Sequence, residues 1–253
     1  MPLNSEYILP PHLRLSNPAD LRFFFKINVM SKKNYIFLLF IFLTTSLLSQ
    51  EDKTGNWLMY FGTNQILDNW SIHTEIQYRN HELTPNTVEQ LLLRTGINYH
   101  LSSASSVTLG YGFIPSYDYE SEQSKPENTE HRIFQQLIMT NKIGRIKFEH
   151  RYRVEQRWVN DDYRNRLRYR LMSFIPINKP VIEKGTFFVG IYDEVFMNTK
   201  STFFDRNRLY FSLGYQVKKS LQVQLGYLNQ RLNSFGKHHL QLGVIFNTDL
   251  REK

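Results

Sequence analysis

The chain has 253 residues, of which 15% are aromatic, a formal net charge of +8 and no cysteine. The lack of cysteine excludes disulfides, so hydrogen bonds and packing alone must hold the fold. After residue 50 no apolar run is long enough to cross a membrane as a helix, so any membrane-embedded form of this part must be a closed β-barrel.

An export signal is predicted ahead of the main domain. Lys32 and Lys33 precede a short apolar run, and small and polar residues then lead to Ser49. This order is typical of a cleaved secretory signal peptide, which we assign to residues 30–49. A membrane anchor is the alternative, because the uncharged stretch is near the lower length limit for a spanning helix. The signal starts at its own methionine, so residues 1–29 are interpreted as a misassigned N-terminal extension.

Residues 50–253 form the predicted mature domain, and apolar and polar residues alternate along much of it. A period of two is typical of β-strands whose two faces meet different surroundings. Because single-chain bacterial barrels usually have an even number of strands, we expect ten to twelve strands, with twelve preferred. The alternating segments lie near residues 56–64, 70–79, 90–100, 107–113, 131–140, 146–158, 164–171, 187–194, 208–216, 221–227 and 239–247.

The connections between these segments alternate in length. Short turns are expected at 102–106, 142–144 and 218–220, and longer polar loops at 80–87, 118–129 and 198–205. Short turns on one rim and long loops on the other are typical of outer-membrane barrels, although the long connection 177–185 breaks the rule. The predicted fold is therefore all-β: a closed, antiparallel, up-and-down transmembrane β-barrel in the outer membrane.

The hairpin over residues 145–170 carries the densest charge. Its uncharged positions are mostly apolar or aromatic and fall on the opposite face. We expect the charged face to line the lumen and the apolar face to meet lipid, the reverse of a soluble barrel. The charged positions are Lys147, Glu149, Arg151, Arg153, Glu155 and Arg157, followed by Arg164, Arg166, Arg168 and Arg170.

Four short segments carry a family resemblance, namely residues 55–57, 151–157, 193–196 and 205–210. In this order they resemble uncharacterised outer-membrane proteins of Bacteroidota that are grouped as a domain of unknown function. The resemblance implies an outer-membrane β-barrel. It implies no catalytic residues, because no activity is established for that family.

The turns allow a register to be estimated for the charged hairpin. Two-residue turns at 143–144 and 161–162 would place Glu155 opposite both Arg132 and Arg168. The same register predicts three further pairs: Arg151 with Gln136, Arg157 with Arg166, and Arg153 with Arg170. Since like charges directly opposite each other are destabilising, something must neutralise these arginines.

Two neutralisers are considered. Glu75 or Glu194 on another wall would make the lumen a structural ion-pair network, whereas a small anionic solute would make it a narrow, anion-preferring pore. Besides outer-membrane lipid, such solutes are the partners we expect; nucleic acid is not, because an exported protein does not routinely meet it. The candidate lumen residues are Arg132, Gln136, Glu149, Arg151, Arg153, Glu155, Arg157, Arg166, Arg168, Arg170, Glu194 and Arg208.

Two other functions remain as alternatives. An outer-membrane lipid hydrolase would need a serine near an outward histidine such as His150, but no serine stands two residues after His150. A soluble periplasmic β-barrel that binds a ligand is the other alternative. Histidines at 81 and 238–239 lack partners at metal-ligand spacing, so no enzyme activity, metal site or cofactor is predicted.

Overall fold

The computed structural model describes residues 54–84, 87–119, 125–200, 202–233 and 235–251. The predicted signal peptide and N-terminal extension lie outside these residues. Among the described residues, no helix is long and apolar enough to cross a membrane.

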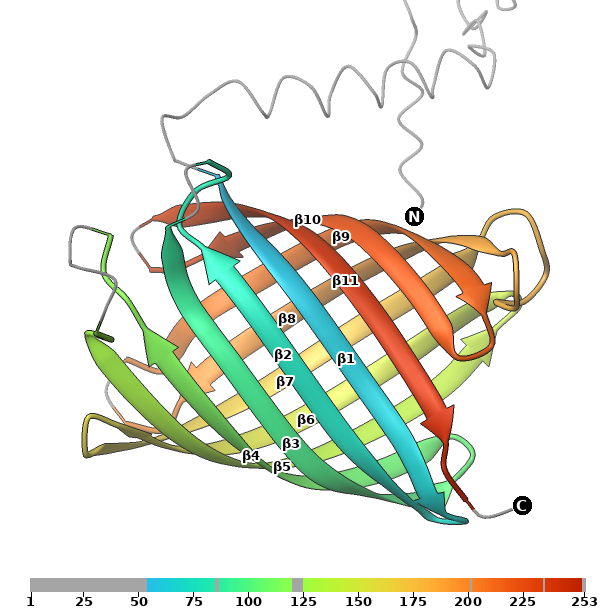
Figure 1. The fold of residues 1–253 in the computed structure, drawn as a ribbon, viewed down its shortest axis with the longest axis horizontal. Helices are drawn as coiled ribbons and strands as arrows, with labels where there is room; N and C mark the ends of the chain where they lie inside the picture. Colours follow the sequence, from blue (N-terminus) through green and yellow to red (C-terminus); the bar gives the residue numbers. More distant parts are fainter. Residues whose placement is uncertain (1–53, 85–86, 120–124, 201, 234, 252–253) are drawn as a thin grey trace, which may run out of the picture. The chain divides into compact units, whose positions relative to one another are not determined.

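The described residues form a closed barrel of eleven β-strands (Figure 1). The eleven alternating segments therefore each become one strand, and the preferred count of twelve is wrong. The strands are β1 (Gly55–Leu67), β2 (Trp70–Asn80), β3 (Val88–Ser102), β4 (Ser105–Ser116), β5 (Asn128–Ile143), β6 (Ile146–Val159), β7 (Asp162–Pro176), β8 (Phe187–Asn198), β9 (Phe204–Lys218), β10 (Leu221–Arg231) and β11 (Gly236–Asp249).

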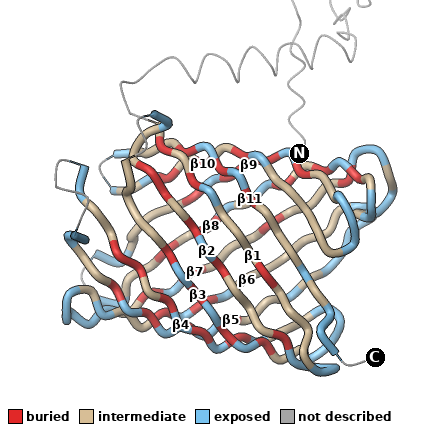
Figure 2. The backbone as a smooth tube through the Cα atoms, in the orientation of Figure 1, coloured by how far each residue is buried: buried red, intermediate tan, exposed pale blue. Residues whose placement is uncertain are grey.

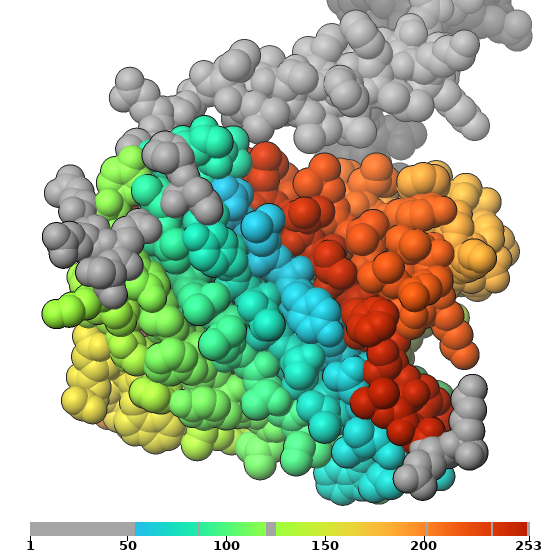
Figure 3. Space-filling view, viewed as in Figure 1, coloured from blue at the N-terminus to red at the C-terminus, as the bar shows by residue number. Residues whose placement is uncertain are grey.

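The barrel closes through a parallel pair. Up-and-down strands alternate in direction, so the first and last of an odd number run the same way and can pair only in parallel. Strand β1 pairs with β11 from Gly55–His239 to Gln65–Asp249. In Figure 3 the side chains of β1, in blue, lie directly against those of β11, in red. The prediction of a fully antiparallel barrel is thus corrected at this seam.

The two faces of the wall have opposite chemistry, as the alternation predicts. Figure 2 shows buried and exposed positions alternating along the strands. On β6, Glu155 is fully buried, whereas its neighbour Val154 is 39% exposed. Across the barrel the buried positions are rich in Arg, Glu, Gln and Ser, and exposed positions are rich in Leu, Ile, Phe and Tyr. The polar face lines the lumen, and the apolar face forms the outer surface.

The two rims differ in their connections. We call the rim with the β1–β2, β3–β4, β5–β6, β7–β8 and β9–β10 connections the turn rim, and the opposite rim the loop rim. Most turn-rim connections span two residues, and only 177–186 is long, as the sequence predicts. On the loop rim the β6–β7 connection is tight instead, because Asn160 and Asp161 adopt positive φ angles of 45° and 72°.

The register of the charged hairpin differs from the estimate by two residues at each turn. The turns lie at 144–145 and 160–161, so Glu155 faces Phe134 and Arg166. A shift of two residues keeps every side chain on its face, whereas a shift of one would reverse them. The three other estimated pairs are replaced: Arg151 faces Ile138 and Arg170, Arg153 faces Gln136 and Arg168, and Arg157 faces Arg132 and Arg164.

The parallel seam can be tested by a disulfide. Leu58 and Leu242 face each other across β1 and β11 and both point outward. Because the chain has no native cysteine, the double variant Leu58→Cys/Leu242→Cys should form one intramolecular disulfide. The oxidised, unfolded chain should then migrate faster on a non-reducing gel. A matched outward pair three strands apart, Leu58→Cys/Leu213→Cys, should stay reduced. Equal cross-linking of both pairs would contradict the seam.

Candidate functional site

A buried carboxylate, Glu155, organises the charged part of the lumen. Its oxygens accept hydrogen bonds from Arg166 and Arg168, both at 2.7 Å, and from Arg132 at 3.3 Å. These three arginines come from two neighbouring strands, β7 and β5, which flank β6. The predicted placement of Glu155 between Arg132 and Arg168 is thus confirmed by its ion pairs, although the register differs.

Glu194 on β8 is the second anionic centre. Its carboxylate lies 2.8 Å from Arg168 and 2.7 Å from Arg151. Arg168 therefore bridges Glu194 and Glu155, as a planar guanidinium with several N–H donors can. The proposed neutralisation of the arginines by another barrel wall is confirmed at this residue.

Three further carboxylates complete the ion pairs. Glu130 contacts Arg132 at 2.6 Å and Arg157 at 2.7 Å, although it is not among the candidate residues. Its position two residues before Arg132 in β5 places it on the same face, and this parity is the signal that could have identified it. The others are Glu75 with Arg94 at 2.8 Å and Glu149 with Arg170 at 2.5 Å.

We call the buried part of this network the charge layer. Arginines outnumber carboxylates in it, and aromatic rings offset part of the difference. The guanidinium carbon of Arg153 lies 4.6 Å from the ring centre of Phe134, and that of Arg168 lies 4.2 Å from Phe196. The charge layer consists of Glu75, Arg94, Glu130, Arg132, Arg153, Glu155, Arg166, Arg168 and Glu194.

Apolar side chains fill the lumen around the charge layer on the loop-rim side. Leu92, Ile114, Phe134 and Phe196 are at most 1% exposed. A Cβ atom at Gly110 would lie 2.2 Å from the ring of Phe134. Any larger residue at position 110 would therefore clash with that ring. Charge and apolar packing together close this half of the barrel.

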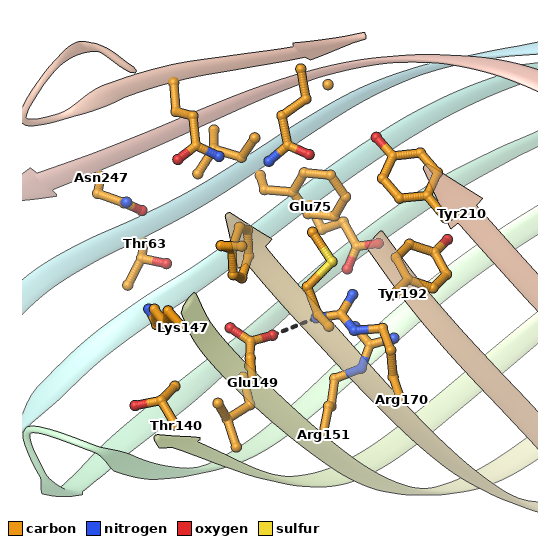
Figure 4. Close-up of a pocket in the computed structure, with 18 of the residues that line it drawn as sticks. Thr63, Glu75, Thr140, Lys147, Glu149, Arg151, Arg170, Tyr192, Tyr210 and Asn247 are labelled. Carbon is orange, nitrogen blue, oxygen red and sulfur yellow. Dashed lines mark hydrogen bonds and ion pairs between the residues drawn. The ribbon is translucent and has the colours of Figure 1, made fainter. Parts of the chain in front are cut away.

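The half near the turn rim is open. A cavity of about 840 Å³ lies there, and we call it the cup. Arg153, Arg168 and Glu194 of the charge layer form its floor, and the connections 144–145 and 180–182 reach its mouth. In Figure 4 the side chains of Glu149, Arg151, Arg170, Tyr192 and Tyr210 point into it from four strands. The arrangement can hold a small polar molecule, because charged and aromatic groups converge on one enclosed space.

The structure divides the twelve candidate residues into two groups. Those that line the cup are Gln136, Glu149, Arg151, Arg153, Arg168, Arg170, Glu194 and Arg208. The other four, Arg132, Glu155, Arg157 and Arg166, do not line it and belong to the ion-paired part of the lumen. Trp57, Arg79 and Gln241 also line the cup and were missed, because single polar or aromatic residues within a strand give no distinctive pattern.

The outward histidine considered for lipid hydrolysis has other partners. His150 hydrogen bonds the Tyr169 hydroxyl at 2.9 Å and the Asn141 side chain at 3.2 Å. Across the described ranges, no serine hydroxyl hydrogen bonds His150, and no three His, Asp or Glu side chains gather into a metal site.

Removing the central carboxylate should destabilise the barrel. Glu155→Gln leaves the charges of Arg132, Arg166 and Arg168 buried without their shared anion, which is expected to cost about 3–5 kcal/mol. Urea unfolding in detergent measures the loss. Asp162→Asn removes the partner of Arg164 in an exposed pair and should change stability by less than about 1 kcal/mol. Equal stability of both variants would contradict a central role for Glu155.

Comparison with known proteins gives a family without an assigned function. The model of DUF2490, a protein family of unknown function, matches residues 54–241. An uncharacterized protein of Methylorubrum extorquens is 29% identical over 154 residues, which are 56% of this chain. The chain spans 64% of that relative's length, and no solved structure matches. The expected domain of unknown function is confirmed, whereas its place in Bacteroidota and in the outer membrane stays a prediction.

Since the match runs from β1 into β11, this chain belongs to the DUF2490 family.

Proposed function

We propose that this protein is an outer-membrane β-barrel whose lumen is closed by the charge layer and whose cup binds a small polar molecule from the turn rim. The observation that carries the proposal is the one-sided lumen. Paired charges and apolar side chains fill the loop-rim side of β5 to β8, while a cavity of about 840 Å³ opens toward the turn rim and extends along β1 and β2 as far as Trp57 and Arg79.

The outer surface supports placement in a membrane. Its middle is a band of Leu, Ile, Val and Phe side chains such as Leu209, Phe211 and Leu213, each at least 51% exposed. Aromatic pairs flank this band: Trp70 with Tyr99 near the turn rim, and Trp158 with Tyr163 near the loop rim. Aromatic girdles around an apolar band are typical of outer-membrane barrels. A soluble protein rarely exposes so much contiguous apolar surface.

The pairing of lumen charges favours a structural network over an anion pore. A pore that selects anions needs arginines whose positive charge is available to a passing ion. Here Arg166 and Arg168 both bind Glu155, which is fully buried. Most of the arginines in the charge layer form close ion pairs with carboxylates, so their charge is not available to a passing anion. We therefore propose that the layer is a partition across the barrel.

The location can be tested by fractionation. Residues 30–253, expressed in a Gram-negative host, should sediment with the outer membrane and require detergent for extraction. The extracted protein should also migrate differently on a gel before and after boiling, because a folded barrel is compact and binds less detergent. A mature protein that is soluble without detergent would instead support a periplasmic binding barrel.

The closed lumen can be tested in planar lipid bilayers. The protein should show no steady conductance, because the charge layer and its apolar packing leave no continuous path. Glu155→Ala combined with Phe134→Ala should create conductance by removing the central anion and a large buried ring. Steady, anion-selective conductance in the unmodified protein that falls in the Arg166→Glu/Arg168→Glu variant would contradict the partition and establish the pore.

A further inference from the structure

Two lumen arginines differ from those of the charge layer because each lies over an indole ring and makes no ion pair with a carboxylate within the described residues. The guanidinium carbon of Arg79 lies 3.9 Å from the ring centre of Trp57, and that of Arg208 lies 4.9 Å from it. Both arginines are only 8% exposed. Two buried like charges thus flank one ring at the β1–β11 seam.

Neither arginine has an ion pair in the described part of the chain. Arg79 donates to the side-chain oxygens of Gln77 at 2.9 Å and Gln90 at 2.6 Å. Arg208 donates through Nε to Gln230 at 2.8 Å. Amide oxygens satisfy hydrogen bonds but carry no net charge. Glu75 and Glu89 attract Arg79 only through space, so no direct ion pair neutralises either arginine. Buried like charges of this kind are costly unless an anion joins them.

The same wall holds polar atoms that lack hydrogen-bond partners. They are the indole Nε1 of Trp57, the amide Nε2 of Gln241 and both ring nitrogens of His239. These side chains are at most 3% exposed, and the rings of Trp57 and His239 lie 4.7 Å apart. Buried polar groups are nearly always hydrogen-bonded in folded proteins, and the indole, the amide and one imidazole nitrogen here are donors, so this cluster suits a ligand with acceptor oxygens.

The group is reached from the cup. Trp57, Arg79, Arg208 and Gln241 all line it, and they come from four different strands. A solute that enters at the turn rim can therefore contact all four side chains.

We propose that Trp57, Arg79, Arg208, His239 and Gln241 form a binding site, the seam site, for a dianionic oxyanion group such as the phosphate of a small phosphate monoester. One dianion balances the two guanidinium charges. Its oxygens accept hydrogen bonds from the guanidinium, indole and amide N–H groups, and a neutral imidazole can donate one more. The inference rests on the proposed function in one respect, that the cup is open to solutes.

The test uses the fluorescence of Trp57. In the variant Trp70→Phe/Trp158→Phe, Trp57 is the one remaining tryptophan, and the detergent-solubilised barrel is titrated with inorganic phosphate at constant ionic strength. A saturable fluorescence change is expected. Adding Arg208→Gln should weaken the apparent affinity by about tenfold or more, because it removes one of the two charges. Arg164→Gln removes an equal charge at an exposed position and should leave the affinity unchanged.

Stability gives a second readout that does not depend on fluorescence. Phosphate should raise the melting temperature of the unmodified barrel, since a ligand that binds only the folded state stabilises it. Gln241→Leu keeps both charges but removes an amide donor, and it should reduce this increase. Without phosphate, Arg208→Gln should melt no lower than the unmodified protein, because it relieves repulsion from Arg79.

Several outcomes would overturn the seam site. Chloride as effective as phosphate, saturation by glutarate but not by phosphate, or unchanged affinity in Arg208→Gln would each contradict one dianionic group held by both arginines. If phosphate fails to bind while the barrel stays in the outer membrane and does not conduct, the seam site is wrong and the proposed function stands. Steady conductance of the unmodified protein would instead contradict the proposed function.

Discussion

Pairing of charge inside a closed wall is the constraint on which the rest of this structure depends. A guanidinium or carboxylate in a barrel lumen loses most of its water, and the cost is recovered only through close partners of opposite charge. Glu155 meets this requirement for arginines on both neighbouring strands. Through Arg168 it is joined to Glu194, so charge balance extends from β5 to β8. Side-chain ion pairs therefore link β5, β6, β7 and β8 in addition to their backbone hydrogen bonds.

The same constraint explains why the lumen has two unlike halves. Ion pairs bring long side chains from neighbouring strands together and occupy the lumen where they occur. Phe134 and Phe196 then pack against the arginines and fill the remaining space. Toward the turn rim charged side chains such as Glu149, Arg151 and Arg170 line a cavity and do not fill it. The filled region and the cavity thus differ mainly in the large apolar side chains that pack beside the ion pairs.

The acidic residues are distributed unevenly around the barrel. Strands β1 and β10 contain no carboxylate, and the only one in β11 is Asp249 at its end. The seam therefore cannot neutralise arginines that point toward it from neighbouring strands. Arg79 and Arg208 lie against Trp57 instead, where the ring face offers only partial compensation. This local shortage of negative charge is what makes the seam suited to an anionic ligand.

The strands, their two faces and the charged lumen can be predicted from the amino-acid pattern alone, because a period of two depends only on backbone geometry and survives a register shift of two residues. The same pattern also identified Glu155, Arg132 and Arg168 as neighbours, since turn positions restrict the pairing of adjacent strands. The parallel closure and the gathering of Trp57, Arg79 and Arg208 at one place depend instead on the three-dimensional arrangement. Those contacts join strands that are distant in the chain, and local periodicity contains no information about which distant strands become neighbours when a barrel closes.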